Sequence, residues 1–196
     1  SQTSNNIFLN EKLLALVKSI YDKKEQLNLS TEDAKLLEDL YESFKANGAT
    51  LNKDDKEKYR KLSMDLSMLT LQFDQNALKD KNRFELLITD ENELSGLPES
   101  ARDAAAMLAK SKDKNGWLFN LSAPSYIPFM RYSDKRDLRE KMYREYMSVG
   151  NKGDEFDNKD IIKKIVNIRL EIAQLMGFKN YAEYALEHTM AKNCLL

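Results

Sequence analysis

The sequence has 196 residues, of which 42% are hydrophobic and 32% are charged, as is common in helical globular proteins. Its 31 basic and 32 acidic residues give a net charge of −1, so no global field would draw in nucleic acid or an anionic membrane. No apolar run approaches the roughly 18 residues of a membrane span, and we therefore expect neither nucleic acid nor a membrane as a partner.

Helix breakers are concentrated in the middle of the chain. The three prolines are Pro98, Pro124 and Pro128, and residues 1–95 contain a single glycine, Gly48. Long helices are therefore expected on both sides of the centre. The spacing of apolar residues and the capping signals predict helices near residues 10–27, 31–47, 53–80, 98–110, 134–149, 158–176 and 181–190.

The helices at 31–47 and 53–80 carry the clearest signals. Ser30 is a natural N-cap and Gly48 a natural C-terminal stop for the first, and Asn52 caps the second. In the second helix, one face is formed by apolar residues that step by three and four: Tyr59, Leu62, Leu66, Leu69 and Phe73. Three further apolar residues widen this face, so we expect burial on more than one side: Met64, Met68 and Leu71.

The central segments 84–97 and 116–132 are predicted to be irregular or extended. Residues 84–89 and 117–121 are short, apolar and aromatic, and are read as one two-stranded pair. Residues 123–132, APSYIPFMRY, contain two prolines, so Ser125 to Tyr132 is predicted to be a non-helical crossing, either an interior connector or the wall of a cleft. The predicted fold class is all-α with at most one short two-stranded β element.

A search for catalytic and metal-binding motifs finds none. Glu187 and His188 suggest the zinc motif H-E-x-x-H, but that motif needs a second histidine, and His188 is the only one in the chain. No glycine-rich phosphate loop, calcium loop or G-x-S-x-G elbow is present. We therefore expect no catalytic residue and no metal ligand in this chain. The single cysteine, Cys194, favours a reducing compartment, so a cytoplasmic location is expected and a periplasmic one stays open.

Four stretches of the sequence stand out: residues 93–100 (ELSGLPES), 116–146, 153–186 and 190–193 (MAKN). In this order they resemble the thimet-oligopeptidase family of zinc metallopeptidases, in particular the bacterial peptidyl-dipeptidase and oligopeptidase-A-like branch. The resemblance continues more weakly through residues 10–80. One departure is His188-Thr189 before MAKN, where relatives tend to have an arginine.

This resemblance implies an almost wholly helical enzyme, much longer than this chain, with two halves that flank a narrow channel for short unstructured peptides. It also implies a zinc ion held by the two histidines of H-E-x-x-H and a downstream glutamate, while the motif glutamate activates a water. These residues lie C-terminal to the matched region, so no catalytic or zinc-binding residue carries over to this sequence.

Residues 1–196 are therefore expected to form a single helical, non-catalytic N-terminal region that forms a wall of the substrate channel. Zinc belongs to the full-length family only, and the chain alone is predicted to be inactive. The alternative is a stand-alone helical protein, derived from that family, that binds peptides or a protein partner. The reading frame downstream of Leu196 would separate the two hypotheses.

The segment at 123–132 holds the candidate peptide contacts, which are Tyr126, Phe129, Arg131 and Tyr132. The expected partners are short peptides or the missing catalytic half. Because a partial chain leaves apolar surface uncovered, self-association is also expected, through an exposed face on the helices at 158–190.

Overall fold

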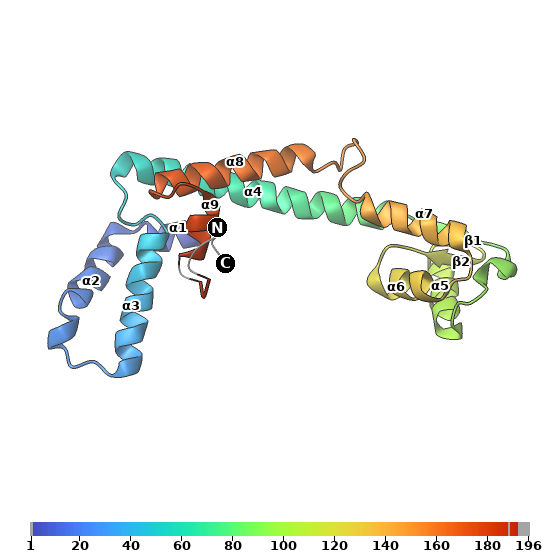
Figure 1. Ribbon diagram of the computed structural model, residues 1–196, viewed down its shortest axis with the longest axis horizontal. Helices are drawn as coiled ribbons and strands as arrows, with labels where there is room; N and C mark the ends of the chain where they lie inside the picture. The colour runs from blue at the N-terminus through green and yellow to red at the C-terminus, as the bar shows by residue number, and fades with distance from the viewer. Residues whose placement is uncertain (1, 188, 192–196) are drawn as a thin grey trace. The chain divides into compact units, whose positions relative to one another are not determined.

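The computed structural model describes residues 2–187 and 189–191. Within this range the fold is all-α apart from one two-stranded sheet, which confirms the predicted fold class. The chain divides into two compact units (Figure 1): Ser1–Thr70 with Lys163–Leu196, here called the terminal unit, and Leu71–Ile162, called the central unit. The sequence predicts a single region, because both boundaries fall inside long helices where no change in composition marks them.

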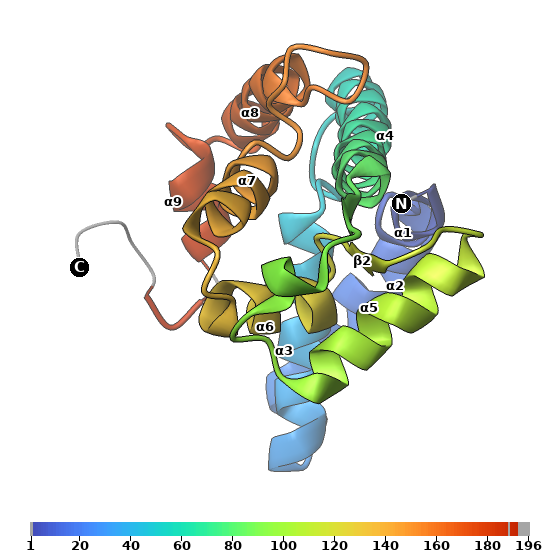
Figure 2. The same ribbon diagram turned by 90° about the vertical axis from the view of Figure 1, so that its right-hand side faces the viewer.

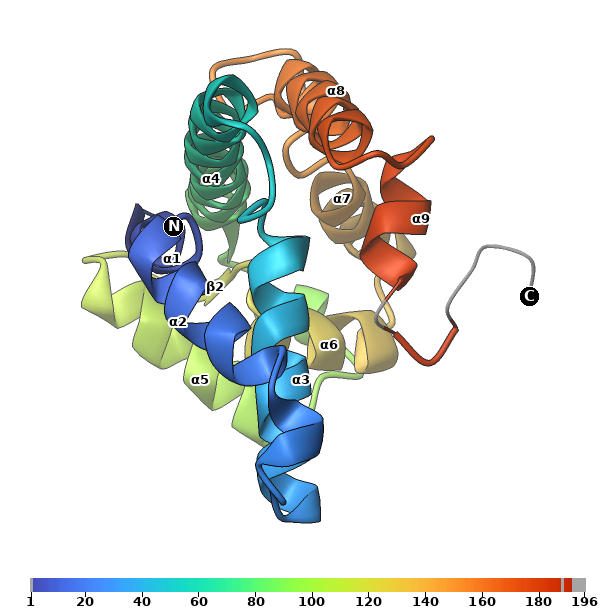
Figure 3. The ribbon, with the colours of Figure 1, turned by 90° about the vertical axis from the view of Figure 1, so that its left-hand side faces the viewer.

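The terminal unit is built from helices. It contains α1 (Gln2–Phe8), α2 (Glu11–Tyr21), the 3-10 turn η1 (Lys24–Gln26), α3 (Thr31–Ala46), the first part of α4 (Lys53–Arg83), most of α8 (Lys159–Leu175) and α9 (Tyr181–Leu186). Figure 3 shows α2 and α3 side by side.

Side-chain caps define where α2 and α3 begin. Asn10 Oδ1 accepts hydrogen bonds from the backbone amides of Lys12 and Leu13, at 3.0 and 3.2 Å. Ser30 Oγ accepts from the amide of Asp33 at 3.1 Å, as predicted. The prediction of one helix over 10–27 is wrong in extent: α1 precedes Asn10, and α2 ends at Tyr21.

Two small apolar clusters stabilise the terminal unit. The first consists of buried residues from α4 and α8 with the residue after α1: Leu9, Tyr59, Leu62 and Ile172. The second lies between α2 and α3 and consists of Val17, Phe44 and Ala49. The ring of Phe8 meets the ring of Phe44 edge to face, with 5.3 Å between centroids.

The central unit is built around a small antiparallel sheet (Figure 2). Strand β1 (Leu86–Ile88) pairs with β2 (Trp117–Phe119) in the register Leu86 to Phe119, which confirms the predicted two-stranded element. Around it lie η2 (Glu91–Leu94), α5 (Glu99–Ser111), α6 (Ala123–Tyr132) and α7 (Arg136–Met147). Its core contains Leu86, Ile88, Leu94, Leu97, Ala105, Phe119, Leu121, Phe129 and Met142.

Gly116 allows the two strands to approach. Its φ is +113°, and a Cβ atom there would lie 2.2 Å from the carbonyl oxygen of Ile88. A side chain at this position would therefore separate β1 from β2.

Residues 123–132 correct one sequence prediction, because the segment expected to be non-helical forms helix α6. Pro124 lies in the first turn, where a helix does not need its amide hydrogen. Pro128 removes one internal hydrogen bond, but Phe129 next to it is completely buried. Core packing of this side chain thus outweighs the local preference against helix at the residues before the prolines.

A buried polar network joins α4 to the α7–α8 connection within the central unit. Asp80 is fully buried, and its Oδ2 accepts a hydrogen bond from the backbone amide of Gly150 at 2.7 Å. Its Oδ1 lies 2.7 Å from Arg83 Nε and 3.1 Å from Lys152 Nζ. Burial by itself lowers the pKa of Lys152, but hydrogen bonds to Glu145 and Asp80 outweigh it and leave that pKa above its ordinary value.

Two buried asparagines extend this network. Asn76 Nδ2 donates to Asn158 Oδ1 at 3.1 Å, and Asn158 Nδ2 donates to the carbonyl oxygen of Phe73 at 3.0 Å. The backbone N–H of Asn158 also donates to the backbone carbonyl oxygen of Gly150 at 2.8 Å. The connection before α8 is therefore held to α4 by several hydrogen bonds.

The remaining predicted helices occur within a few residues of their expected bounds, a common uncertainty at helix ends. The largest differences are at α9, which ends at Leu186 rather than 190, and at α4, which continues to Arg83 rather than ending at 80. None of the helices in the described part is long and apolar enough to cross a membrane.

The expectation that α4 is buried on more than one side is wrong. Met64, Met68 and Leu71 are 42%, 68% and 58% exposed. The elements of this chain cover the face that carries Tyr59 and Leu62, and they leave the methionine face open.

Candidate peptide-contact site

The four candidate contact residues of α6 differ in burial. Phe129 is completely buried and packs edge to face on Phe119, with ring centroids 4.8 Å apart, so it offers no surface to a peptide. Arg131 and Tyr132 are exposed, with the guanidinium carbon 5.5 Å from the ring centroid. Arg131 and Tyr132 therefore offer surface to a ligand, whereas Phe129 is withdrawn into the core.

Tyr126 has a structural partner. Its ring is half-buried and stacks on Tyr146 of α7, with 4.3 Å between centroids. Burial, followed by the neighbouring hydroxyls of Tyr146 and Tyr143, raises the pKa of Tyr126 above its ordinary value. Tyr126 therefore stays neutral at physiological pH and joins α6 to α7.

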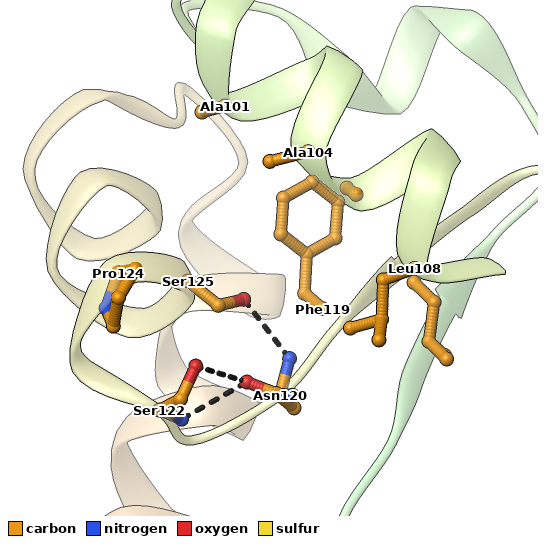
Figure 4. A pocket seen from close by; sticks show the side chains of 10 residues that line it. Ala101, Ala104, Leu108, Phe119, Asn120, Ser122, Pro124 and Ser125 are labelled. Atoms are coloured by element: carbon orange, nitrogen blue, oxygen red, sulfur yellow. Dashed lines mark hydrogen bonds between the residues drawn. The ribbon is translucent and has the colours of Figure 1, made fainter. Parts of the chain in front are cut away.

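A pocket of about 220 Å³ lies beside this helix, between α5, β2 and the beginning of α6 (Figure 4). Small side chains on α5 leave the space open, and Phe119 lies against it. The lining residues are Ala101, Ala104, Ala105, Leu108, Leu118, Phe119, Asn120, Ser122, Pro124 and Ser125.

The polar groups at the pocket bond mainly to one another. The backbone amide of Asn120 donates to Ser125 Oγ at 3.0 Å, and Ser122 Oγ donates to Asn120 Oδ1 at 2.6 Å (Figure 4). The amide of Ser122 donates to the same Oδ1 at 3.0 Å. These bonds hold the turn between β2 and α6 in shape and leave a mostly apolar interior.

This lining determines which groups the pocket can accept. None of its residues has an ionisable side chain, so the pocket offers no partner to a charged group. Dry apolar cavities of about 150 Å³ in proteins can bind a molecule as large as benzene. The pocket is therefore suited to one uncharged, aliphatic or aromatic side chain.

Sequence reasoning did not identify this pocket. The run Ala104-Ala105-Ala106 predicts helix, and that interpretation is confirmed by α5. The available signal was the succession of alanines at positions 101, 104 and 105, close to one helix face, followed by a proline-containing segment. Only the fold shows that these two stretches face each other.

The described residues provide no metal centre. No group of three or more His, Cys, Asp or Glu side chains among residues 2–187 and 189–191 is placed to hold an ion. His188 and Cys194 lie outside the described residues. Catalytic zinc sites usually combine two or three His or Cys ligands, and the sequence contains one histidine and one cysteine.

Comparison with known proteins identifies the family. The model of peptidase family M3 matches residues 129–194. Oligopeptidase A from Salmonella typhimurium is 36% identical over 197 residues, which cover 98% of this chain and 29% of that protein.

Two further relatives extend the comparison. The probable cytosolic oligopeptidase A from Arabidopsis thaliana is 38% identical over 181 residues, covering 89% of this chain and 26% of that protein. Dipeptidyl carboxypeptidase from Escherichia coli is 32% identical over 193 residues, covering 98% of this chain and 28% of that protein. The chain thus spans less than a third of the length of these curated relatives, and it belongs to peptidase family M3.

Proposed function

We propose that this chain is a non-catalytic region of an oligopeptidase-like zinc peptidase and forms part of the wall of its peptide channel. The observation that carries the proposal is the match to oligopeptidase A over 98% of the chain but 29% of that protein. The zinc-binding and catalytic residues of such an enzyme belong to the remaining length. A cytoplasmic location is proposed from the name of the Arabidopsis relative.

Within this proposal, the alanine-lined pocket receives an apolar side chain of the peptide. Arg131 and Tyr132 are further contacts, since both are exposed on the same short helix. Tyr126 acts indirectly, by holding α6 against α7 through its stacked ring.

The test is a chimera in which this chain replaces the matching region of the Salmonella oligopeptidase A. We expect the chimera to cleave a short quenched fluorescent peptide in a zinc-dependent manner. A chimera that folds and binds zinc but leaves the peptide intact would contradict the proposal.

Variants of the chimera test the pocket. Ala104→Trp fills it from an exposed position on α5, and we expect KM to rise about tenfold with little change in kcat, because binding energy is lost equally from bound substrate and transition state. Met107→Trp is the matched control: Met107 is 73% exposed on the same helix and does not line the pocket. An equal effect of both variants would reject the pocket as a substrate contact.

The chain alone should hydrolyse no peptide. Purified protein incubated with zinc and the same peptide should show no chelator-sensitive cleavage, because a zinc hydrolase needs about three protein ligands and a base. Cleavage that disappears in His188→Ala would overturn this and make His188 a ligand.

We also propose that the isolated chain self-associates through α8. Val166 and Leu170, one helical turn apart in the terminal-unit part of α8, are 56% and 39% exposed. Exposed apolar side chains on one helix face agree with surface that the rest of a longer peptidase would cover.

Sedimentation tests this association. We expect a concentration-dependent dimer that Val166→Glu abolishes, because a charge would then be buried. Asn167→Glu, an equal charge change at the neighbouring exposed position, should leave it intact. A monomer at high concentration would contradict the proposal.

The uncovered α8 face also fits the alternative, a stand-alone protein of this family that binds another protein. Failure of the chimera together with specific binding to a peptide or protein partner would favour that function.

A further inference from the structure

A second pocket lies in the terminal unit, and neither the family comparison nor the proposed function assigns it a role. Its volume is about 270 Å³, and residues from both ends of the sequence line it. Asn5 comes from α1, Tyr59 and Ser67 from α4, and Tyr184 from α9.

The walls of this pocket are tied together by hydrogen bonds. The hydroxyl of Tyr184 donates to the backbone carbonyl of Ala46 at 2.8 Å, which joins α9 to the end of α3. Tyr184 is largely buried, and this burial, together with the nearby Tyr59, raises its pKa above the ordinary value. The hydroxyl therefore stays protonated, and the bond to Ala46 persists over the physiological pH range.

Asn5 is the unusual member of the lining. Its side chain is 8% exposed, and its Nδ2 meets no hydrogen-bond acceptor among the described residues. Buried polar groups in folded proteins nearly always have a partner, so an unpaired amide at a pocket suggests that a ligand provides one. The terminal torsion of asparagine is broad, which allows the amide to turn its N–H toward that ligand.

The remaining lining residues restrict the class of ligand. No Asp, Glu, Lys, Arg or His lines the pocket, so nothing there would neutralise a charged ligand. Hydroxyl and amide groups such as those of Ser63 and Asn47 stand beside the apolar side chains of Leu66 and Ile172. A peptide amide with an aliphatic side chain combines these properties: a carbonyl acceptor, an N–H donor and an apolar group.

We propose that this pocket binds an uncharged peptide segment, with Asn5 Nδ2 donating a hydrogen bond to a main-chain carbonyl oxygen of that peptide. The site lies in the terminal unit, whereas the alanine-lined pocket belongs to the central unit. Peptide binding at this site can therefore be detected or rejected independently of the activity of the chimera.

The test is titration of the ¹⁵N-labelled chain with N-acetyl-leucinamide, an uncharged amide with an aliphatic side chain, followed by NMR. We expect saturable shifts of the Asn5 side-chain NH₂ signals. Asn5→Leu removes the donor without burying a charge, and it should weaken binding about tenfold, the loss of one hydrogen bond. Asn6→Leu is the control, because Asn6 is exposed on the same helix and does not line the pocket.

In the titration with N-acetyl-leucinamide, two results would overturn the proposal. One is the absence of saturable shifts with N-acetyl-leucinamide. The other is equal binding by the parent chain and Asn5→Leu, provided that both keep the same circular dichroism spectrum. Glucose serves as an uncharged hydroxyl ligand without an amide, and saturable binding of glucose at least as tight as that of the amide would assign the pocket to a sugar instead.

Discussion

The two units differ in how completely they bury their largest side chains. In the part of the chain that the structure describes, the largest fully buried side chains are Phe44, Phe119, Phe129, Ile88, Leu118, Leu121, Met142 and Asp80. All of them except Phe44 belong to the central unit. The central unit therefore has the core of a small independent domain, whereas the terminal unit relies on two smaller clusters. In the proposed peptidase, we therefore expect the terminal unit to be the one stabilised more by the rest of the protein.

The comparison can be measured because the single tryptophan, Trp117, lies in β2 of the central unit. Its fluorescence reports on that unit, while circular dichroism at 222 nm reports on helices in both units. In urea, we expect part of the circular dichroism signal to be lost before the fluorescence changes.

The largest effect is expected from Phe129→Ala. Removal of a completely buried phenylalanine from a continuous core costs about 3–5 kcal/mol. The tryptophan midpoint in urea should fall strongly. Ile127→Ala, at a position 57% exposed on the same helix, is the control and should change it little.

Asp80→Ala should have the second largest effect, about 3 kcal/mol, at the low end for loss of one partner of a buried ion pair. The low end is expected because the side chains of Arg83 and Lys152 are 37% and 19% exposed to solvent, so water can partly hydrate their charges. Asp74→Ala, at an exposed position of the same helix, is the matched control. Similar tryptophan midpoints for the two variants would show that the network does not stabilise the central unit.

Ser30→Ala should cost the terminal unit about 1 kcal/mol, because it removes the N-cap bond to the amide of Asp33. The early part of the circular dichroism transition should move to lower urea while the tryptophan midpoint stays unchanged. A shift of both transitions together would mean that the two units unfold as one.

The smallest effect concerns pH and the central unit. Hydrogen bonds from Lys112 and Lys114 lower the pKa of Glu85. The contribution of Glu85 to the stability of the folded state is therefore present above the pKa of the unfolded state and is lost as the pH falls through the pKa of the folded state. Since Glu85 is partly exposed, its effect is small. Glu85→Gln should reduce the acid-dependent loss in the free energy of unfolding of the central unit, followed by tryptophan fluorescence, by less than about 1 kcal/mol. If the tryptophan midpoint of Glu85→Gln depends on pH as that of the parent chain does, Glu85 does not contribute to the stability of the central unit.

Local signals allowed much of the fold to be predicted. Ser30 as a cap, Gly48 as a stop with φ of +80°, and the pairing of residues 86–88 with 117–119 all depend on neighbouring residues or on short apolar runs. These features need little knowledge of the rest of the fold.

The errors, and the features that could not be predicted, arise where tertiary contacts override or add to local preference. Residues 123–132 are helical despite Pro128, because Phe129 packs into the core. Asp80 resembles a surface charge on a polar helix, and only the α7–α8 connection makes it a buried acceptor. The alanine-lined pocket depends on α5 and α6 lying face to face, which neither stretch reveals alone.

Hydrogen exchange followed by mass spectrometry tests the central claim most directly, on both the isolated chain and the chimera with oligopeptidase A. In the isolated chain, we expect β1, β2 and α5–α7 to be more protected than α2 and α3, since their core is more completely buried. In the chimera, protection should rise mainly in the terminal unit and along α8. Equal protection of both units in the isolated chain, unchanged in the chimera, would contradict the view that the terminal unit is completed by the rest of a longer peptidase.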